Sequence, residues 1–147
     1  MRIGDVADAT GLTQRAIRYY EALDLLTPAL RRSGANRRYE HDDVERLLFI
    51  KRLREDVGLS LAEIRTYLEI EDLRRTIKSE YLSVEDPIVH LELLDRVEAG
   101  IRRRVVMLDR KLALVSALRA QDEASLERVA ALRNEQGARL HGAAVGV

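Results

Sequence analysis

The stretch IGDVADATGLTQRAIRYYEALDLL, residues 3–26, decides the fold of the first part of the chain. Its first eight residues predict a short helix, and Gly11 predicts the end of that helix because glycine readily adopts a positive φ. Thr13 is a good N-cap for a second helix, which we expect from Gln14 to about Leu23. Two helices joined by a three-residue turn that contains glycine are typical of a helix-turn-helix.

The second helix carries polar side chains that suit DNA recognition. Gln14, Arg15 and Arg18 fall opposite its apolar residues, near the N-terminal end that a recognition helix inserts into the major groove. Arginine can form two hydrogen bonds with a guanine edge and glutamine two with an adenine edge, and Tyr19 or Tyr20 can donate to a phosphate. A solvated surface helix would show the same polar face, so this helix alone leaves the function open.

Residues 27–39, TPALRRSGANRRY, follow with a different character. Proline, serine, glycine and asparagine supply turn chemistry, and the stretch predicts a small β-hairpin, or wing, with its tip at residues 33–36. Between Thr13 and Tyr39 there are six arginines and two acidic residues, a local charge of +4 in a chain whose net charge is zero. Guanidinium groups so close together repel one another, which a fold tolerates most easily where a polyanion binds. An ordinary polar turn is the alternative interpretation.

Two further helices are predicted after the hairpin. Residues 41–56 carry a broad apolar face, with two acidic residues in the first turn where they favour the helix dipole. Ser60 and Glu63 form a capping box that starts another helix, which we expect to end near Ile70. Residues 71–86 predict a connecting helical segment, either a separate element or an extension of the preceding helix.

A long helix is expected from Asp86-Pro87, a capping acid followed by a proline at the first helical position, to about residue 120. Its apolar residues recur largely in steps of three and four, which indicates a coiled-coil seam. At 1.5 Å per residue such a helix is roughly 50 Å long, too long to bury its seam against the preceding domain, so it predicts a dimer. A weaker stripe over 121–147 predicts a short C-terminal helix and a frayed tail. The predicted dimerisation residues are Leu91, Leu94, Ile101, Val105, Leu108, Leu112 and Val115.

The composition excludes several classes of protein. No cysteine is present, which excludes disulfides, thiolate metal sites and cysteine nucleophiles. The histidines lie far apart, and no phosphate-binding glycine loop or catalytic constellation is found, so we expect neither an enzyme nor a cofactor. His90 and Glu92 leave a metal site as the minor alternative to a solvated or capping role for that histidine. No apolar run approaches the roughly 20 residues that span a bilayer, and the first residues lack the apolar stretch of a signal peptide, so we expect a cytoplasmic protein without a membrane partner.

In order, spacing and identity these motifs resemble those of the MerR family of bacterial transcription regulators. The string IGDVADATGLTQRAIRYYEALDLLTP resembles the family's opening, NRRYEHDDVERLLFIKRLRE its wing exit and third helix, and VGLSLAEIRTYL its fourth helix. The resemblance implies a mainly α protein with a winged helix-turn-helix domain over residues 1–70. It also places the family's antiparallel dimerisation coil at residues 87–120.

The resemblance implies roles for individual residues. Arg18 and Tyr19 would touch DNA from the recognition helix, and residues 37–39 would grip phosphates from the wing. Tyr20 is expected to pack inside the domain and Glu21 to orient a nearby arginine. Together the predicted DNA-binding residues are Thr13, Gln14, Arg15, Arg18, Tyr19, Arg31, Asn36, Arg37, Arg38 and Tyr39.

The sequence departs from the family pattern at two points. Many members have Gly-Tyr before the wing arginine, where this chain has Ala35-Asn36. Metal-sensing members use cysteines at the two ends of the coil, and the absence of cysteine excludes a thiolate metal sensor.

The resemblance further implies a mechanism and partners. A homodimer would bind a pseudo-palindrome between the −35 and −10 elements of a promoter and bend and untwist that double-stranded DNA for RNA polymerase. A small-molecule or protein effector would shift the balance between two dimer geometries. A plain repressor without a ligand is one alternative. A coiled-coil adaptor that binds protein is the other, and the arginine-rich hairpin argues against it.

Overall fold

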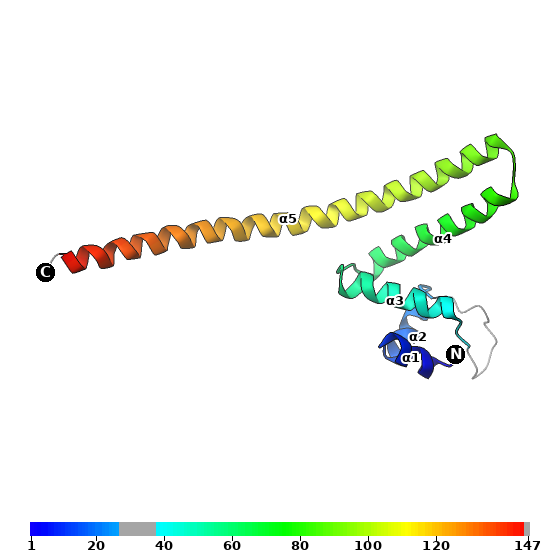
Figure 1. The fold of residues 1–147 in the computed structure, drawn as a ribbon, viewed down its shortest axis with the longest axis horizontal. Coiled ribbons are helices and arrows are strands. Elements are labelled where there is room, and N and C mark those ends of the chain that lie inside the picture. Colours follow the sequence, from blue (N-terminus) through cyan, green and yellow to red (C-terminus); the bar gives the residue numbers. More distant parts are fainter. Residues whose placement is uncertain (27–37, 146–147) are drawn as a thin grey trace. The chain divides into compact units, whose positions relative to one another are not determined.

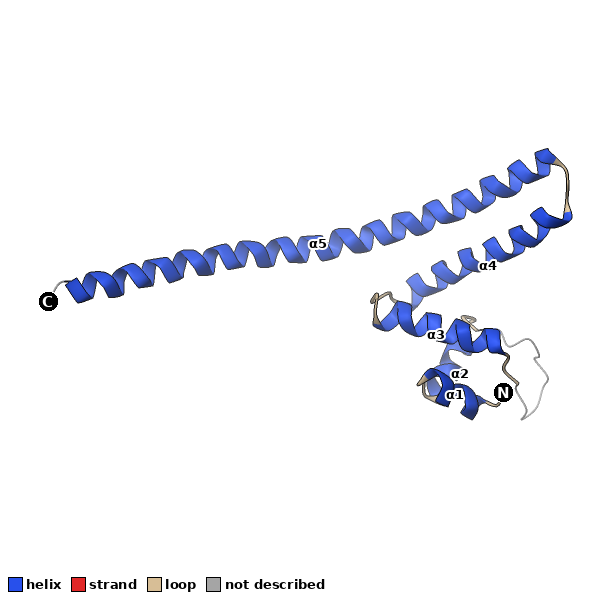
Figure 2. Cartoon of the chain, viewed as in Figure 1, coloured by secondary structure: helices blue, strands red, loops and turns tan. Residues whose placement is uncertain are grey.

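The computed structural model describes residues 1–26 and 38–145, and all regular secondary structure in these ranges is helical (Figure 1, Figure 2). The chain divides into two units, Met1–Ile101 and Arg102–Val147. Among its described residues, the first unit holds four helices and the start of a fifth, which also supplies the helix of the second unit. The helices are α1 (Ile3–Thr10), α2 (Gln14–Ala22), α3 (His41–Glu55), α4 (Leu61–Ser83) and α5 (Pro87–Val145).

The core of the first unit is built by apolar residues of α1 to α4. Val6, Ile17, Leu47, Ile50 and Ile64 have no exposed surface, and burying each such side chain stabilises the fold by about 1.5–3 kcal/mol. α1 packs against both α2 and α3, and α3 packs against α4. This packing fixes which face of α2 points outward.

The turn between α1 and α2 has the geometry that the sequence predicts. Gly11 adopts the left-handed conformation at φ 66°, and its N–H donates to the carbonyl oxygen four residues earlier at 2.8 Å. Lys51 Nζ of α3 donates to the Thr10 carbonyl at 3.1 Å, which satisfies a further acceptor at the end of α1. The Thr13 hydroxyl accepts the backbone N–H three residues later at 3.1 Å. The predicted helix end at Gly11 and N-cap at Thr13 are therefore confirmed.

Reciprocal side-chain caps also start α3 and α4. The Asp43 carboxylate accepts the Glu40 N–H at 2.8 Å at the start of α3. At the start of α4, the Ser60 hydroxyl accepts the Glu63 N–H at 3.2 Å, and the Glu63 carboxylate accepts the Ser60 N–H at 2.7 Å. The predicted capping box is confirmed, and it fixes the direction in which α4 leaves α3.

α4 is longer than the sequence interpretation allows. The helix expected to end near Ile70 runs to Ser83, so most of the segment 71–86 is its extension and not a separate element. No glycine or proline interrupts this stretch, and Ile77 is as deeply buried as Ile70, at 3% exposure. The apolar face thus continues for two more turns, and the helix continues with it.

The turn between α4 and α5 is closed by two side chains. Asp86 caps α5 as predicted, and its carboxylate accepts the Ile88 N–H at 2.9 Å. The Nε2 atom of His90 lies 3.0 Å from the Tyr81 carbonyl oxygen and 2.6 Å from that of Val84. Because both partners can only accept, this ring nitrogen carries the proton and donates. His90 thus caps the end of α4.

α5 does not end near residue 120, and the prediction of a separate short helix over 121–147 is wrong. The helix is continuous to Val145. Its second half is rich in alanine, leucine, arginine and glutamate, which sustain a helix even where the apolar seam weakens. Neither α5 nor any other helix in the described ranges is long and apolar enough to cross a membrane. Two ion pairs at i, i+4 spacing join Arg119 to Glu123 at 3.1 Å and Arg139 to Glu135 at 2.8 Å.

The predicted β-hairpin wing lies almost wholly outside the described residues, since residues 27–37 are not described. Arg38 and Tyr39 belong to the loop that precedes α3, and residues 1–26 and 38–145 contain no strand. The hairpin is therefore not supported, and the interface below rests on the helices and on this loop.

Candidate nucleic-acid interface

α2 has one buried and one exposed face. Ile17 is fully buried and Tyr20 is 5% exposed, and both fix the helix against the core. Arg15 and Arg18 are exposed on the outer face, and Tyr19 next to them is 52% exposed. The N-terminal half of α2 therefore offers cationic and hydrogen-bonding groups without any cost to the core, which is what a recognition helix requires. The packing role expected for Tyr20 is confirmed.

The structure brings the helix residues of the predicted interface together. Thr13 and Gln14 are exposed at the start of α2, one turn from Arg18. The Thr13 hydroxyl, which accepts a backbone N–H as the N-cap, still has its own proton to donate. Arg38 is exposed in the loop before α3. Arg31, Asn36 and Arg37 lie outside the described residues.

Tyr39 is packed inside the domain. Its side chain is only 2% exposed, and its hydroxyl donates to the Glu21 carboxylate at 2.7 Å. Its backbone N–H donates to the Met1 carbonyl at 2.9 Å. Little of the Tyr39 side chain is accessible for the predicted phosphate contact, because its ring is buried in the domain. Tyr39 instead ties the loop before α3 to the recognition helix.

The exit from α2 is held by two arginines that the sequence interpretation missed. Arg46 of α3 donates through Nε to the Leu25 carbonyl at 2.6 Å, and Arg65 of α4 donates to the Leu23 carbonyl. The Arg46 guanidinium also binds both carboxylate oxygens of Asp72, at 2.7 and 2.8 Å. α3 and α4 thus clamp the backbone that leaves the recognition helix. No local pattern could reveal these bonds, because the partners lie 21 and 42 residues apart.

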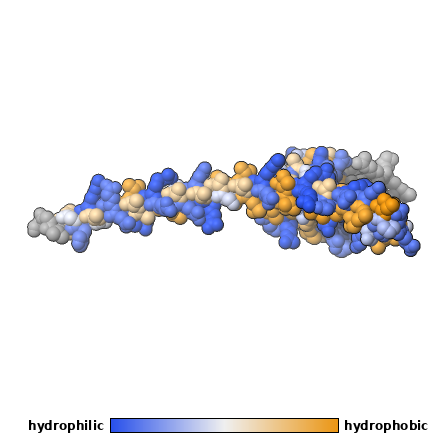
Figure 3. Space-filling model, turned by 90° about the horizontal axis from the view of Figure 1, so that it is seen from above, coloured by the Kyte–Doolittle hydropathy of each residue, from blue (hydrophilic) through white to orange (hydrophobic). Residues whose placement is uncertain are grey.

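The predicted dimerisation residues lie along α5 and are largely open to solvent. In the first unit Leu91 is 64% exposed, and in the second unit Leu112 is 64% and Val115 57% exposed. Figure 3 shows apolar surface along this helix between hydrophilic side chains. Exposed apolar residues at this spacing are what a helix presents to a partner helix. The same spacing recurs beyond the predicted end of the seam, at Leu126 and Val129.

Within residues 1–26 and 38–145, no group of three or more histidine, aspartate or glutamate side chains is arranged to hold a metal ion. His90, the histidine that the sequence places near the start of α5, directs Nε2 at two carbonyl oxygens and not at a carboxylate. The described part of the interface is thus made of guanidinium, amide, hydroxyl and phenol groups, which recognise phosphates and base edges.

Comparison with known proteins agrees with this geometry. Residues 1–70 match the family described as MerR HTH family regulatory protein. The chain is 32% identical over 112 residues to the HTH-type transcriptional regulator YfmP of Bacillus subtilis, a match that covers 76% of this chain and 80% of that protein. It is 34% identical over 102 residues to heavy metal-dependent transcription regulator 2 of Rhizobium meliloti, covering 69% of this chain and 67% of that protein.

Among solved structures, the transcription regulator PbrR691 from Ralstonia metallidurans in complex with lead(II) shares 28% identity with the chain. The match covers 81% of this chain and 84% of that one, with a TM-score of 0.46. The conclusion on family rests on the sequence matches. With its exposed recognition helix and these relatives, the chain belongs to the MerR family of helix-turn-helix, DNA-binding transcriptional regulators.

Proposed function

We propose that the protein acts as a homodimer that binds a pseudo-palindromic promoter element between the −35 and −10 elements. It modulates transcription there by distorting the DNA for RNA polymerase. The observation that carries this proposal is the pairing of two features in one chain. α2 presents a polar recognition face, and α5 presents an apolar seam that a single chain leaves exposed. A dimer through α5 would carry two such faces, as a pseudo-palindrome requires.

The DNA contacts would divide between α2 and the loop before α3. Arg18 and Gln14 lie near the N-terminus of α2 and suit base edges in the major groove. Arg38 in the loop suits phosphates, which position a protein without reading sequence. Because the segment from Thr13 to Tyr39 has a local charge of +4, affinity should fall steeply as salt rises.

Distortion of the spacer is the costly step of this mechanism. Bending a site of this size costs on the order of 1–6 kcal/mol, which added contacts with the bent backbone must offset. A dimer supplies these contacts in pairs, and a change in the angle between its halves would change the bend. An effector would act by favouring one of the two dimer geometries.

A nuclease footprint on promoter DNA tests the DNA-binding part, with Arg18→Ala as the variant and Arg110→Ala as its control. Both arginines are exposed, but Arg110 lies on α5. Loss of a base contact predicts a decrease in affinity of roughly 1–3 kcal/mol, about five- to 150-fold, for Arg18→Ala. The control should retain wild-type affinity. Hypersensitive bases at the centre of a symmetric protected site would support the distortion, and a featureless centre in every condition would refute it.

The seam has a matched pair of leucines for a test of the dimer. Leu112 lies on the predicted seam and is 64% exposed, whereas Leu114, two residues on, lies off the seam and is 67% exposed. Neither contributes to the core of the single chain, so an aspartate at either position should leave the fold intact. Light scattering should show a monomer for Leu112→Asp and a dimer for Leu114→Asp. A surviving Leu112→Asp dimer would place the contact elsewhere.

A further inference from the structure

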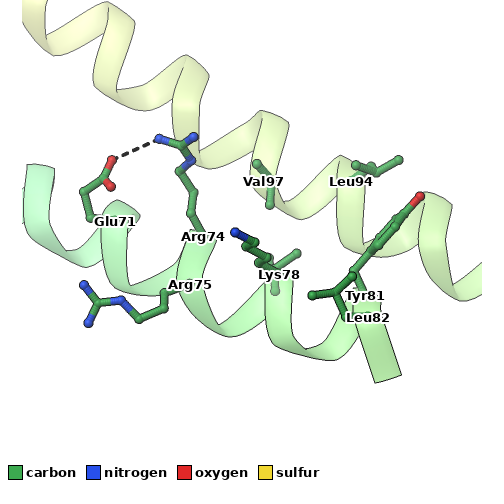
Figure 4. Close-up of a pocket in the computed structure, with 9 residues that line it drawn as sticks. Glu71, Arg74, Arg75, Lys78, Tyr81, Leu82, Leu94 and Val97 are labelled. Atoms are coloured by element: carbon green, nitrogen blue, oxygen red, sulfur yellow. Dashed lines mark hydrogen bonds and ion pairs between the residues drawn. The ribbon is translucent and has the colours of Figure 1, made fainter. Parts of the chain in front are cut away.

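A groove of about 460 Å³ lies between the C-terminal half of α4 and the first turns of α5, within the first unit (Figure 4). Its apolar lining includes Ile77 and Tyr81 on α4 and Leu94 and Val97 on α5. Ile77 is 3% exposed, whereas Leu94 is 50% exposed, so one side of the groove is core and the other is open to solvent. The volume lies in the range of small-molecule sites, about 300–1,000 Å³.

One wall of the groove is already fixed in place. The Tyr81 ring stacks on His90 with ring centroids 3.8 Å apart and an angle of 16° between the planes. His90 is in turn anchored by its hydrogen bonds to the carbonyl oxygens at the end of α4. A ligand that packs against this wall does not have to order it, which lowers the entropic cost of binding.

The rim of the groove is cationic. Arg74, Arg75 and Lys78 line it together with a single acid, Glu71. The Glu71 carboxylate accepts from the Arg74 guanidinium at 3.1 Å, the contact drawn as a dashed line in Figure 4. Arg74 and Lys78 are one helical turn apart and therefore share a face of α4. Three cations against one carboxylate leave an excess of positive charge beside an apolar lining.

We propose that this groove binds an organic anion with an apolar body, of the chemical class of an aliphatic carboxylate. Arg74 and Lys78 would hold the carboxylate, and the aliphatic chain would lie on Ile77, Tyr81 and Val97. The proposal rests on the proposed function, because it supplies the effector of that regulator. Charge-assisted hydrogen bonds would bind the carboxylate, and burial of the aliphatic chain would supply the remaining binding free energy.

The charge of the rim favours this occupant over a second copy of the chain. Leu94 also belongs to the predicted seam, so a partner helix could cover the apolar lining. A partner α5 that covers Leu94 would pack through apolar residues, whereas the three cations beside the lining favour an anion. A carboxylate neutralises the rim while its chain covers the lining.

The position of the groove connects it to the recognition helix. α4 is one continuous helix from Leu61 to Ser83, so a shift at Lys78 would be passed along it to Asp72. Asp72 binds the Arg46 guanidinium, which donates to the Leu25 carbonyl at the exit of α2. An anion that displaces α4 would therefore act on the backbone that leaves the recognition helix.

Isothermal titration calorimetry on the full chain without DNA tests the site with decanoate, decanol and acetate. Decanol lacks the charge and acetate lacks the apolar body, so both should bind at least ten-fold more weakly than decanoate. The double variant Arg74→Gln/Lys78→Gln should lose at least ten-fold in decanoate affinity. Its control, Arg103→Gln/Arg110→Gln, removes two exposed arginines of α5 outside the groove and should bind as the wild type does.

The proposal is overturned if decanoate does not bind below its micelle concentration, if decanol binds equally well, or if the double variant keeps its affinity for decanoate. Circular dichroism of the double variant separates a lost site from a lost fold. Binding confined to the monomeric Leu112→Asp variant would assign the groove to a second copy and would also overturn it. The dimer and DNA contacts are measured separately, by light scattering and footprint, so their failure is distinguishable from failure of the anion site.

Discussion

Replacing Arg46 with methionine should destabilise the protein by about 2–3 kcal/mol. Methionine keeps the aliphatic stem but removes the donor to the Leu25 carbonyl at 2.6 Å and both bonds to Asp72. A hydrogen bond from a charged group contributes about 1.5–3 kcal/mol to stability. Leu25 is 1% exposed, so its carbonyl oxygen would be left buried without this donor in the variant. The ion pair adds only about 0–1 kcal/mol, because the Asp72 side chain is 48% exposed.

Asp72→Asn separates the two contributions. The amide keeps one oxygen that can accept from Arg46 and leaves the bond to Leu25 untouched, so the loss should stay below about 1 kcal/mol. Urea unfolding, monitored by circular dichroism, gives the free energy of unfolding of both variants. An unchanged dependence of this free energy on urea concentration (the m-value) shows that the variants can be compared with the wild type. Equal losses in the two variants, or less than about 1 kcal/mol for Arg46→Met, would refute the assignment of the stabilisation to the backbone carbonyl.

Three further substitutions test the elements that position α2 and α4. Gly11→Ala forces a Cβ into a left-handed residue, 3.1 Å from Lys51 Nζ, and should cost about 1–2 kcal/mol in urea unfolding; an unchanged midpoint would mean that the turn relaxes. Ser60→Ala removes the N-cap of α4 and should lower the Tm through a loss of about 1 kcal/mol, and a Tm equal to the wild type would contradict the cap. Tyr39→Phe removes the bond to Glu21 and should cost about 0.5–1.5 kcal/mol in urea unfolding; an unaltered stability would leave the tyrosine hydroxyl without a structural role.

The parts of the fold that the sequence predicts are those with a local cause. Gly11 and Thr13 mark a helix end and a helix start through the conformation and the hydrogen bond of one residue each. Ser60 and Glu63 do the same within four residues. Such signals need no knowledge of the rest of the chain, and the exposed face of α2 follows from the period of its apolar residues.

The parts that could not be predicted depend on contacts between distant residues or on the absence of a stop signal. The burial of Tyr39 depends on Glu21, which is 18 residues earlier in the chain, and on packing that a local pattern does not contain. The sequence predicts that the long helix ends near residue 120, where the apolar stripe becomes weaker. A helix ends where its residues no longer favour the helical backbone conformation. A polar residue in the seam changes what the helix packs against, but the helix itself continues.

The two anchors at the exit of α2 end on carbonyl oxygens, those of Leu23 and Leu25. Every amino acid supplies such an acceptor, so the hold on this backbone does not depend on which side chains occupy the two positions. The outward side chains of α2 do not contribute to the core, because Ile17 and Tyr20 make the packing contacts on the opposite face. In the proposed mode of DNA binding, the side chains that read bases and the contacts that hold α2 in place can therefore change independently. Exchange of a few outward side chains would then alter the preferred operator sequence without altering the packing of the domain.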